Sequence, residues 1–362
     1  MIGVTNSIVE LPRLVETLSQ EDRDLFNGIF KVVISDGGLH IPDTMQEWVE
    51  KQFGSVDAVM SQMVVRVMNL VTCEDALFNP LRLSRPLNMR NGASMEEMIR
   101  SGAPDPLGSP TELTPADLFG RIKGRHSITA ANVAKVDGFS GLVVFENYNP
   151  LEFSKDDIED YLDVGLQWAE EAHRLDPGAR YYFFLWNCLW RSGASLVHGH
   201  AQVVLGRGAH YGKIEHLRRC AAQYRKDRGR DYFRDLIQVH RALGLALDKE
   251  DVTIMAYATP TKEREVLLIA PNMRGSLKGC VYEVLRCFRD NMGVTSFNLA
   301  LYMPPLGPAL EEWGGFPTVV RIVDRGDPSL RTSDMGGMEL YACPVVSMDP
   351  FQVAVALREN IP

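Results

Sequence analysis

The stretch Asn187-Cys-Leu-Trp-Arg-Ser-Gly-Ala-Ser-Leu-Val-His-Gly-His-Ala-Gln202 contains two histidines, His198 and His200, and the amide Gln202 at alternate positions. The apolar run Val203-Val204-Leu205 follows it, so the end of the stretch is predicted to be a β-strand. Residues two apart on a strand point to the same face. The two histidines and the glutamine are therefore expected to form a row on one surface of a sheet.

The loop in front of this row consists of small residues, Ser192-Gly193-Ala194-Ser195. Such a loop lets backbone N–H groups and a hydroxyl approach a phosphate closely. A histidine beside a phosphate-binding loop suits covalent nucleotidyl transfer, because imidazole is a nucleophile whose orientation a neighbouring group can fix. A His-x-His pair on a strand is also typical of a metal site, or of two polar residues on a half-exposed face, and the spacing alone leaves these alternatives open.

The composition is that of an ordinary globular protein. The 362 residues are 45% hydrophobic and 23% charged, which fits two domains or one large composite. A formal net charge of −9 argues against broad binding to nucleic acid or to a membrane surface, but it leaves a small anionic substrate open. No apolar run has the length of a membrane span, and the N-terminus lacks the pattern of a signal peptide. The six scattered cysteines include no Cys-x-x-Cys pair, so reduced thiols in a cytoplasmic protein are expected.

Three segments of different character follow one another along the chain. Residues 1–78 are expected to form a helical N-terminal extension, since residues 55–70 carry apolar side chains at spacings of three and four. Residues 88–113 are rich in Gly, Pro, Ser and Asn and are predicted to be a loop. Beyond residue 113, strands and helices follow a similar order twice. The chain is therefore divided into a first half, residues 79–230, and a second half, residues 231–362. An α+β fold with an internal duplication is predicted, each half being an antiparallel sheet with helices on one side.

The individual elements follow from periodicity and capping. Ser154 and Asp157 form a capping pair that is expected to open a helix over residues 155–175. Further helices are expected over 213–228, near 281–291 and from 349, and strands at 140–145, 181–186, 252–258, 266–270, 296–303 and 319–323.

The quoted stretch resembles the active-site signature of galactose-1-phosphate uridylyltransferases, the transferase branch of the histidine-triad (HIT) superfamily. That signature is an asparagine, five residues, Gly-x-Ser, two residues and His-Pro-His-x-Gln. The same spacing joins Asn187, Gly193, Ser195, His198, His200 and Gln202. The resemblance covers residues 79–362 and includes Asn132, the segment 141–150 and, near the C-terminus, Gly337-Met-Glu339.

The resemblance implies two fused HIT-like halves with the chemistry in the first. His200 would attack the α-phosphorus of a nucleotide derivative, and a phosphate-bearing acceptor would then take the nucleotide from the histidine. His198 would orient His200, Gln202 would donate to the phosphoryl oxygens, and the Gly193–Ser195 loop would hold the same charge. The hydrolase branch has a third histidine in place of the glutamine. Because glutamine cannot act as a general base near neutral pH, transfer is favoured over hydrolysis.

Five further residues are assigned to binding by the same resemblance. Asn132 and Asn187 would contact the nucleoside or its phosphates, and Glu339 would contact the sugar or acceptor. Arg82 and Arg85 lie in a segment that resembles the N-terminal Asn-Pro-Leu region of the family and are candidate phosphate ligands, with a solvated surface as the alternative.

The chain departs from the family where many members bind a structural zinc. Those members use a Cys-x-x-Cys pair, a further histidine and the first motif histidine. Here Asp105-Pro-Leu-Gly108 and Asn149 stand at the first two places, so no zinc and no other cofactor is expected. The segment 316–324 likewise has no His-x-His pair for a second metal. Gly199 stands where the family has proline.

The sequence therefore predicts a nucleotidyltransferase that uses a nucleoside-diphosphate sugar or a dinucleotide and a phosphorylated acceptor, in a uridylyltransferase-like or phosphorylase-like reaction. A catalytically quiet nucleotide-binding or scaffold protein and a HIT-type hydrolase of nucleotide conjugates are the alternatives. No nucleic-acid or membrane partner is expected, and the resemblance suggests a homodimer.

Overall fold

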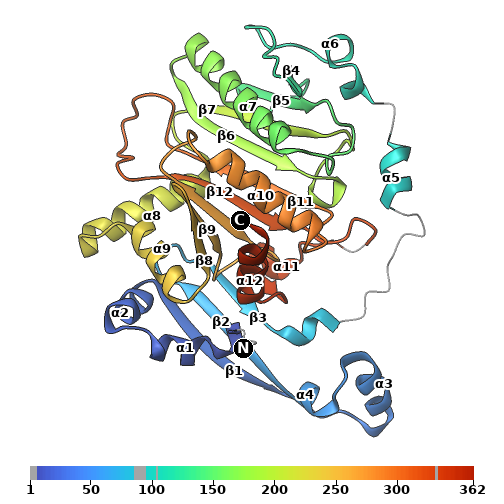
Figure 1. Cartoon of the computed structure of the whole chain (residues 1–362), viewed down its shortest axis with the longest axis vertical. Coiled ribbons are helices and arrows are strands. Elements are labelled where there is room, and N and C mark those ends of the chain that lie inside the picture. The colour runs from blue at the N-terminus through green and yellow to red at the C-terminus, as the bar shows by residue number, and fades with distance from the viewer. Residues whose placement is uncertain (1–5, 85–94, 103–104, 331–332) are drawn as a thin grey trace.

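The computed structural model describes residues 6–84, 95–102, 105–330 and 333–362. It has the predicted α+β fold, with helices around two sheets (Figure 1). The larger sheet is antiparallel and has the strand order β4-β5-β7-β6-β11-β12-β10-β9-β8. Its strands are β4 (Ser127–Ala131), β5 (Phe139–Phe145), β6 (Ala179–Asn187), β7 (His200–Arg207), β8 (Ala246–Lys249), β9 (Val252–Ala256), β10 (Val266–Ala270), β11 (Phe297–Tyr302) and β12 (Thr318–Asp324).

The order of these strands confirms the predicted duplication. In the first half, β4, β5, β6 and β7 lie in the order β4-β5-β7-β6, and in the second half β9, β10, β11 and β12 lie in the order β9-β10-β12-β11. The two halves meet where β6 pairs with β11. Helix α7 (Lys155–Leu175) joins β5 to β6, and α10 (Leu277–Asp290) joins β10 to β11 in the same way. These two helices pack side by side across one face of the sheet (Figure 1).

Helix α7 has the predicted bounds, and its packing identifies the covered face of the sheet. Ser154 and Asp157 form the expected capping box at its start. Trp168 of α7 is fully buried, and a side chain at Gly141 of β5 would lie 3.2 Å from its indole nitrogen. Since Gly141 pairs with Val203 of β7, the face that carries Val203 lies under α7. Residues His200 and Gln202 alternate with Val203 and therefore belong to the opposite face.

The expectation of a helical segment over residues 1–78 is wrong in part. The segment contains η1 (Ile8–Glu10), α1 (Leu11–Thr17), α2 (Gln20–Ile29), α3 (Asp43–Phe53) and α4 (Val56–Met60), but also β1 (Phe30–Gly38), β2 (Ser61–Asn69) and β3 (Asp75–Phe78). The helix expected over 55–70 ends at Met60, because the β-branched Val65 and Val67 are buried at alternate positions and pair with β1. The smaller sheet is completed by β13 (Val345–Val346), which runs parallel to β3. The boundaries near residues 78 and 230 stay predictions.

The remaining elements connect or flank the sheets. The predicted loop 88–113 contains short helices in its described part, α5 (Met95–Ser101), η3 (Pro106–Gly108) and α6 (Pro110–Leu113). The others are η2 (Pro80–Ser84), η4 (Trp190–Ser192), α8 (Gly212–Arg228), α9 (Tyr232–Ala242), α11 (Gly337–Tyr341) and α12 (Pro350–Asn360). No helix within the described ranges is long and apolar enough to cross a membrane.

A buried histidine in α9 predicts how stability depends on pH. His240 is fully buried and stacks on Tyr257, and burial lowers its pKa to about 4 against a hydrogen bond to the Leu236 carbonyl that acts to raise it. The unfolded chain binds a proton at this residue near pH 6.5, before the folded chain does. The free energy of unfolding should therefore fall as the pH drops from about 6.5 to 4, by up to about 3 kcal/mol.

Urea unfolding between pH 7.5 and 4.5 measures this loss. In His240→Gln the free energy of unfolding should fall less over this pH range, since glutamine takes up no proton there. An identical pH dependence in wild type and His240→Gln would contradict the assignment.

Candidate active site

His200 and Gln202 lie in β7 with their neighbours on two adjacent strands. His200 is opposite Val144 of β5, and Gln202 is opposite Leu142 of β5 and Leu185 of β6. Continuing the β6–β7 register by two residues along each strand puts Asn187 opposite His200. Both site residues thus occupy the face away from α7, beside the end of β6.

His198 does not belong to the strand, which differs from the predicted row of three. Strand β7 begins at His200, and His198 lies in the bend before it, still buried. Its backbone carbonyl is nevertheless close to the second histidine, because Nδ1 of His200 lies 2.7 Å from that oxygen. The first histidine therefore holds the second through its main chain.

The tautomer of His200 follows from this contact. A carbonyl oxygen only accepts, so Nδ1 of His200 carries the proton and donates it to the His198 carbonyl. The lone pair then resides on Nε2. Burial lowers the pKa of His200, while the hydrogen bond to His198 acts in the opposite direction. Near neutral pH the ring is thus an uncharged imidazole with an available nucleophilic nitrogen.

The loop between β6 and β7 turns sharply where the sequence has small residues. Gly193 has φ +103°, in the left-handed region that glycine adopts without a steric penalty. A side chain on Gly193 would point toward Nδ2 of Asn187, which lies 3.8 Å from the Cβ position. The predicted phosphate loop and the motif asparagine are therefore adjacent. Ser195 is exposed in the bend that follows.

The surroundings of His198 do not fit a structural zinc. Its Nε2 lies 2.9 Å from the Phe145 carbonyl, and its Nδ1 lies 3.6 Å from Oδ1 of Asp105, beyond hydrogen-bond distance. The amide of Asn149 is engaged by Glu152 instead, at 3.1 Å. Two candidate donors do not make a tetrahedral site, and no group of three or more metal-binding side chains occurs among the described residues. Asp105 takes the place beside His198 as a buried carboxylate.

Gly199 is required by close packing, which explains the departure from proline. A Cβ at this position would lie 2.7 Å from the Asn147 carbonyl oxygen and 2.7 Å from Cδ2 of Phe145. The Gly199 N–H also donates to the Tyr148 carbonyl at 2.9 Å, a bond that proline cannot make.

We expect Gly199→Ala to lower the free energy of unfolding by about 1–3 kcal/mol, because the backbone around Asn147 must move. Chemical denaturation measures the loss, and Gly138→Ala is the matched control, since a Cβ there meets nothing within 4 Å. Equal stabilities of the two variants would contradict the packing argument.

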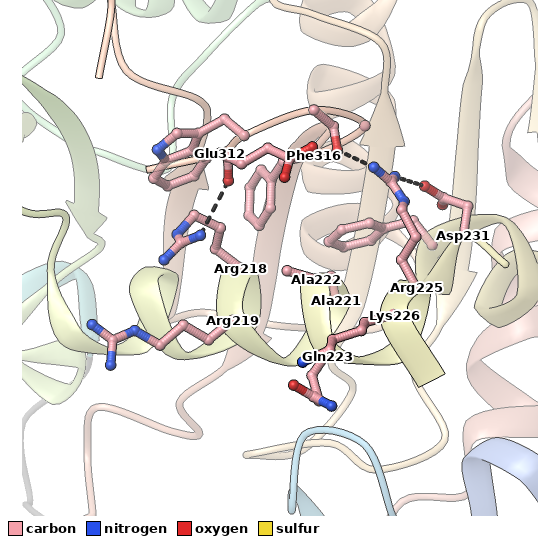
Figure 2. A pocket seen from close by; sticks show the side chains of 14 residues that line it. Arg218, Arg219, Ala221, Ala222, Gln223, Arg225, Lys226, Asp231, Glu312 and Phe316 are labelled. Atoms are coloured by element: carbon pink, nitrogen blue, oxygen red, sulfur yellow. Dashed lines mark hydrogen bonds and ion pairs between the residues drawn. The ribbon is translucent and has the colours of Figure 1, made fainter. Parts of the chain in front are cut away.

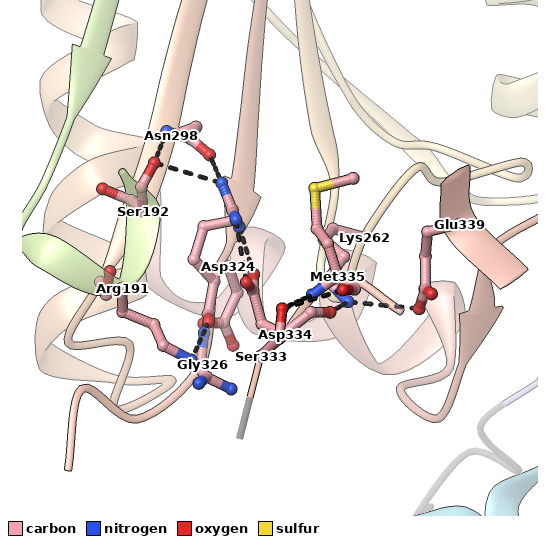
Figure 3. A network of polar contacts seen from close by, with 12 residues as sticks. Arg191, Ser192, Lys262, Asn298, Asp324, Gly326, Ser333, Asp334, Met335 and Glu339 are labelled. Atoms are coloured by element: carbon pink, nitrogen blue, oxygen red, sulfur yellow. Dashed lines mark hydrogen bonds and ion pairs between the residues drawn. The ribbon is translucent and has the colours of Figure 1, made fainter. Parts of the chain in front are cut away.

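A polar network from the second half reaches the loop of the first (Figure 3). Asn298 of β11 donates from Nδ2 to Oδ1 of Asn187 at 2.6 Å and to the Ser192 carbonyl at 3.0 Å. Arg325 donates to Oδ1 of Asn298 and to both carboxylate oxygens of Asp334, at 2.5 and 3.0 Å. Burial acts to raise the pKa of Asp334, but the hydrogen bond and charge of Arg325 lower it overall.

The same network includes the residue that was expected to contact the sugar. Lys262 donates to the Asp334 carbonyl and lies 3.5 Å from Oε1 of Glu339. Glu339, in α11, is thus connected to the loop through Lys262, Asp334 and Arg325 (Figure 3). Neither Asn298 nor Arg325 is predicted from the sequence. The only signal for them was a polar residue at the start of one strand and a charged cluster directly after the next.

Of the other predicted binding residues, Asn132 lies on the same face of the sheet as His200, and Arg82 lies far from it. Asn132 follows β4 on the same face of the sheet, where its amide donates to Oγ of Ser140 at 2.7 Å. Arg82 is exposed in η2, next to α3, where Gln52 donates to the carbonyl of Ser84. Figure 1 places α3 at the opposite end of the molecule from β7, so the structure does not bring Arg82 to the site. Arg85 lies outside the described residues.

A cavity of about 650 Å³ between α8 and the loop before β12 is separate from this site (Figure 2). Its arginines are already engaged. Arg218 donates to the Glu312 carbonyl at 3.1 Å, and Arg225 donates to the Gly314 carbonyl and to Asp231, both at 2.7 Å. None of the predicted site residues that the structure describes lines it.

Comparison with known proteins finds similar folds. Neither a family model nor a curated protein sequence matches the chain. An ADP-glucose phosphorylase from Arabidopsis thaliana with bound ADP-glucose has a TM-score of 0.61 at 14% identity, over 80% of this chain and 96% of that one. A uridylyltransferase has a TM-score of 0.56 at 14% identity, over 82% and 98%. A galt-like protein from Arabidopsis thaliana has a TM-score of 0.54 at 15% identity, over 71% and 98%.

These likenesses confirm the predicted resemblance at the level of the fold. The chain shares its fold with these solved structures, and it covers nearly their full length. Because unrelated activities share folds, the function has to be argued from the site itself.

Proposed function

We propose that this chain is a nucleotidyltransferase that carries a nucleoside monophosphate on His200 between a nucleotide donor and a phosphate-bearing acceptor. The observation that carries the proposal is the state of His200. Its ring is buried and uncharged, with Nδ1–H bound to the His198 carbonyl and Nε2 left with its lone pair. A histidine held in this way beside a glycine loop and two amides is suited to attack a phosphorus atom.

The reaction would proceed in two displacements at the α-phosphorus. In the first, the Nε2 lone pair of His200 forms a P–N bond, and the bond from phosphorus to the bridging oxygen breaks, so the distal phosphate group leaves with the electron pair. In the second, an acceptor phosphate oxygen forms a P–O bond as the P–N bond breaks, which restores His200. Gln202 and the Gly193–Ser195 loop would donate hydrogen bonds to the phosphoryl oxygens in both steps.

The substrate class is supported by the fold neighbours. One is an ADP-glucose phosphorylase with bound ADP-glucose, and another is a uridylyltransferase. We therefore propose a nucleoside-diphosphate sugar or a dinucleotide as donor, and a sugar phosphate or inorganic phosphate as acceptor. Gln202 supports transfer rather than hydrolysis, because a neutral amide cannot activate water as a base.

Location and assembly belong to the same proposal. The six cysteines are all free thiols, which supports a reducing compartment such as the cytoplasm. The homodimer implied by the resemblance is testable by light scattering of the purified chain.

A labelling experiment tests the function. The wild-type protein is incubated with ADP-glucose, UDP-glucose or diadenosine tetraphosphate that carries radioactive phosphorus at the α-position. We expect an acid-labile, base-stable label on the protein, as a P–N bond to histidine requires, and its discharge by glucose 1-phosphate or inorganic phosphate.

Two other outcomes would decide for the alternatives. Failure of every donor to label the wild-type protein would contradict the transferase and support a quiet nucleotide-binding protein. A label that forms and is then lost to water without any acceptor would support the hydrolase.

A further inference from the structure

We propose that Asn298 and Arg325 are positioning residues that fix the orientation of the Asn187 amide, so that its N–H donors face the phosphate loop. This inference rests on the proposed function, since it assigns the orientation to binding of a substrate phosphate. It extends the site into the second half of the chain, to residues that no sequence motif marks.

The orientation follows from which groups can donate. The guanidinium of Arg325 has only donors, so the atom of Asn298 that faces it must be the carbonyl oxygen Oδ1. The amide nitrogen of Asn298 then lies 3.0 Å from the Ser192 carbonyl, which only accepts and to which Arg325 also donates at 3.3 Å. Both neighbours impose the same orientation on Asn298.

The orientation is passed on to Asn187. Its contact with Nδ2 of Asn298 at 2.6 Å requires an acceptor, so Asn187 presents Oδ1 to the second half. Its own Nδ2 is left on the other side, 3.8 Å from the Cβ position of Gly193. Asn187 therefore presents two N–H groups to the glycine loop, which is the arrangement an anionic phosphoryl group requires.

Arg325, at the end of the contacts that join Arg325, Asn298 and Asn187, is held in place by a charged partner. Arg325 is bound by both carboxylate oxygens of Asp334, and the side chains of this pair are 14% and 12% exposed. The Arg325 N–H of the main chain also donates to the Ser296 carbonyl at 2.9 Å, next to β11. Because Arg325 is largely buried, held at its main chain and bound to both carboxylate oxygens of Asp334, its guanidinium cannot easily turn away from Asn298.

The contact between Asn298 and Asn187 depends on how the strands of the sheet are paired. Asn298 is opposite Asn187 where β11 pairs with β6, the pair of strands at which the two halves meet. Since the β6–β7 register, continued by two residues, places Asn187 opposite His200, the three residues lie in one row across β7, β6 and β11. The second half, although it lacks the motif histidines, thus supports the chemistry of the first.

The test uses Asn298→Asp, which has the same shape but lacks the amide donors. The variant still accepts from Arg325, but it cannot donate to Asn187 or to Ser192. We expect single-turnover labelling of His200 by ADP-glucose or UDP-glucose to slow by about 10²-fold, the loss typical of one donor to a developing phosphoryl or oxyanion charge. Because a carboxylate at this position faces the Ser192 carbonyl and lowers the midpoint of thermal unfolding, the rates are compared per folded molecule, well below that midpoint. Arg325→Lys, which keeps a donor toward Asn298, should label faster than Arg325→Met.

The matched control is Asn272→Asp, which makes the same charge change at an exposed asparagine. Its side chain only accepts there, from the Arg274 N–H at 2.7 Å, and aspartate can accept equally well. Asn272→Asp should therefore label at the wild-type rate. A wild-type labelling rate in Asn298→Asp would overturn the inference and leave the proposed function intact.

A second measurement separates failure of the inference from failure of the proposed function. In protein labelled with ¹⁵N-asparagine, the side-chain amide signal of Asn187 is followed while inorganic pyrophosphate is added, which needs no chemistry at His200. We expect a shift in wild type and in Asn272→Asp, and a much smaller one in Asn298→Asp. If the wild type never becomes labelled by donors but shows this pattern, only the transferase fails. If the wild-type signal does not respond, or Asn298→Asp responds equally, the positioning role is contradicted.

Discussion

Replacing His200 by alanine is expected to lower the rate of nucleotidyl transfer by at least about 10³-fold, because the variant has no atom on which the nucleotide can be carried. The other groups that would bind phosphate, the Gly193 loop and the amides of Gln202 and Asn187, remain in place. Donor binding should therefore persist while the covalent label disappears. Comparing the dissociation constant of ADP-glucose or UDP-glucose with the yield of labelled protein in both proteins measures the two effects separately.

His210 provides a matched control for this substitution. It is also a buried histidine, with 4% of its surface exposed, and burial lowers its pKa to about 4. Its ring contacts the tilted rings of Tyr181 and Trp313, outside the row of His200 and Asn187. His210→Asn should be labelled like wild type, per folded molecule. A label of normal yield on His200→Ala would show that another residue is the nucleophile.

Much of the fold could be predicted because its signals are local. Helix α7 begins after Ser154 and ends at Leu175 as expected, since a capping box and an amphipathic repeat lie within one segment. Strand β10 has the predicted bounds for a similar reason, a short apolar run between polar turns. The segment 55–70 was predicted wrongly because its helical spacing is real only as far as Met60. Beyond that point, pairing of β2 with β1 decides the structure.

In the candidate site, too, the residues marked by a local motif could be predicted and those brought in by distant strand pairing could not. The positions of His200, Gln202 and Asn187 follow from a motif with fixed spacing on two neighbouring strands. Asn298 and Arg325 could not be found in this way, because they reach Asn187 only through the pairing of β6 with β11, more than a hundred residues away in sequence. Arg82 was expected to bind phosphate near His200 because its segment resembles one of the family, but it lies far from β7 (Figure 1). A short sequence likeness does not say where the segment that carries it will pack.

Replacing Arg321 by methionine is expected to lower the free energy of unfolding by about 3–5 kcal/mol, because two carboxylates would then be left without their cation. Arg321 lies in β12 with its side chain 13% exposed, and it donates to Oε1 of Glu265 at 2.6 Å and to Oε1 of Glu74 at 2.7 Å. Burial acts to lower the pKa of Arg321, but Glu265 and Glu74 raise it overall. For Glu74 burial acts to raise the pKa, and Arg321 lowers it overall. The charge of Arg321 thus stabilises both carboxylates.

The position of Glu74 makes this group a connection between segments. Glu74 precedes β3 in the N-terminal segment, whereas Arg321 lies in β12 of the large sheet and Glu265 directly precedes β10 of the same sheet. Tyr257, next to β9, also donates its hydroxyl to Glu74, at 2.7 Å. Loss of Arg321 should therefore loosen the N-terminal segment from the sheet first. Amide hydrogen exchange in β2 and β3 should accelerate more than exchange in β6 and β7.

Two further variants separate lost charge compensation from lost packing. Arg174→Met removes an exposed arginine, 69% exposed and paired with Glu171 on α7, and should leave the free energy of unfolding nearly unchanged because solvent screens this pair. The triple variant Arg321→Met, Glu74→Gln, Glu265→Gln keeps the methionine but removes both charges, so it should regain much of the stability lost by Arg321→Met alone. Urea denaturation measures all four proteins. If the triple variant is as unstable as the single one, the loss is one of packing and hydrogen-bond geometry. If the triple variant recovers, the arginine is needed because the fold brings Glu74 and Glu265 to the same buried place.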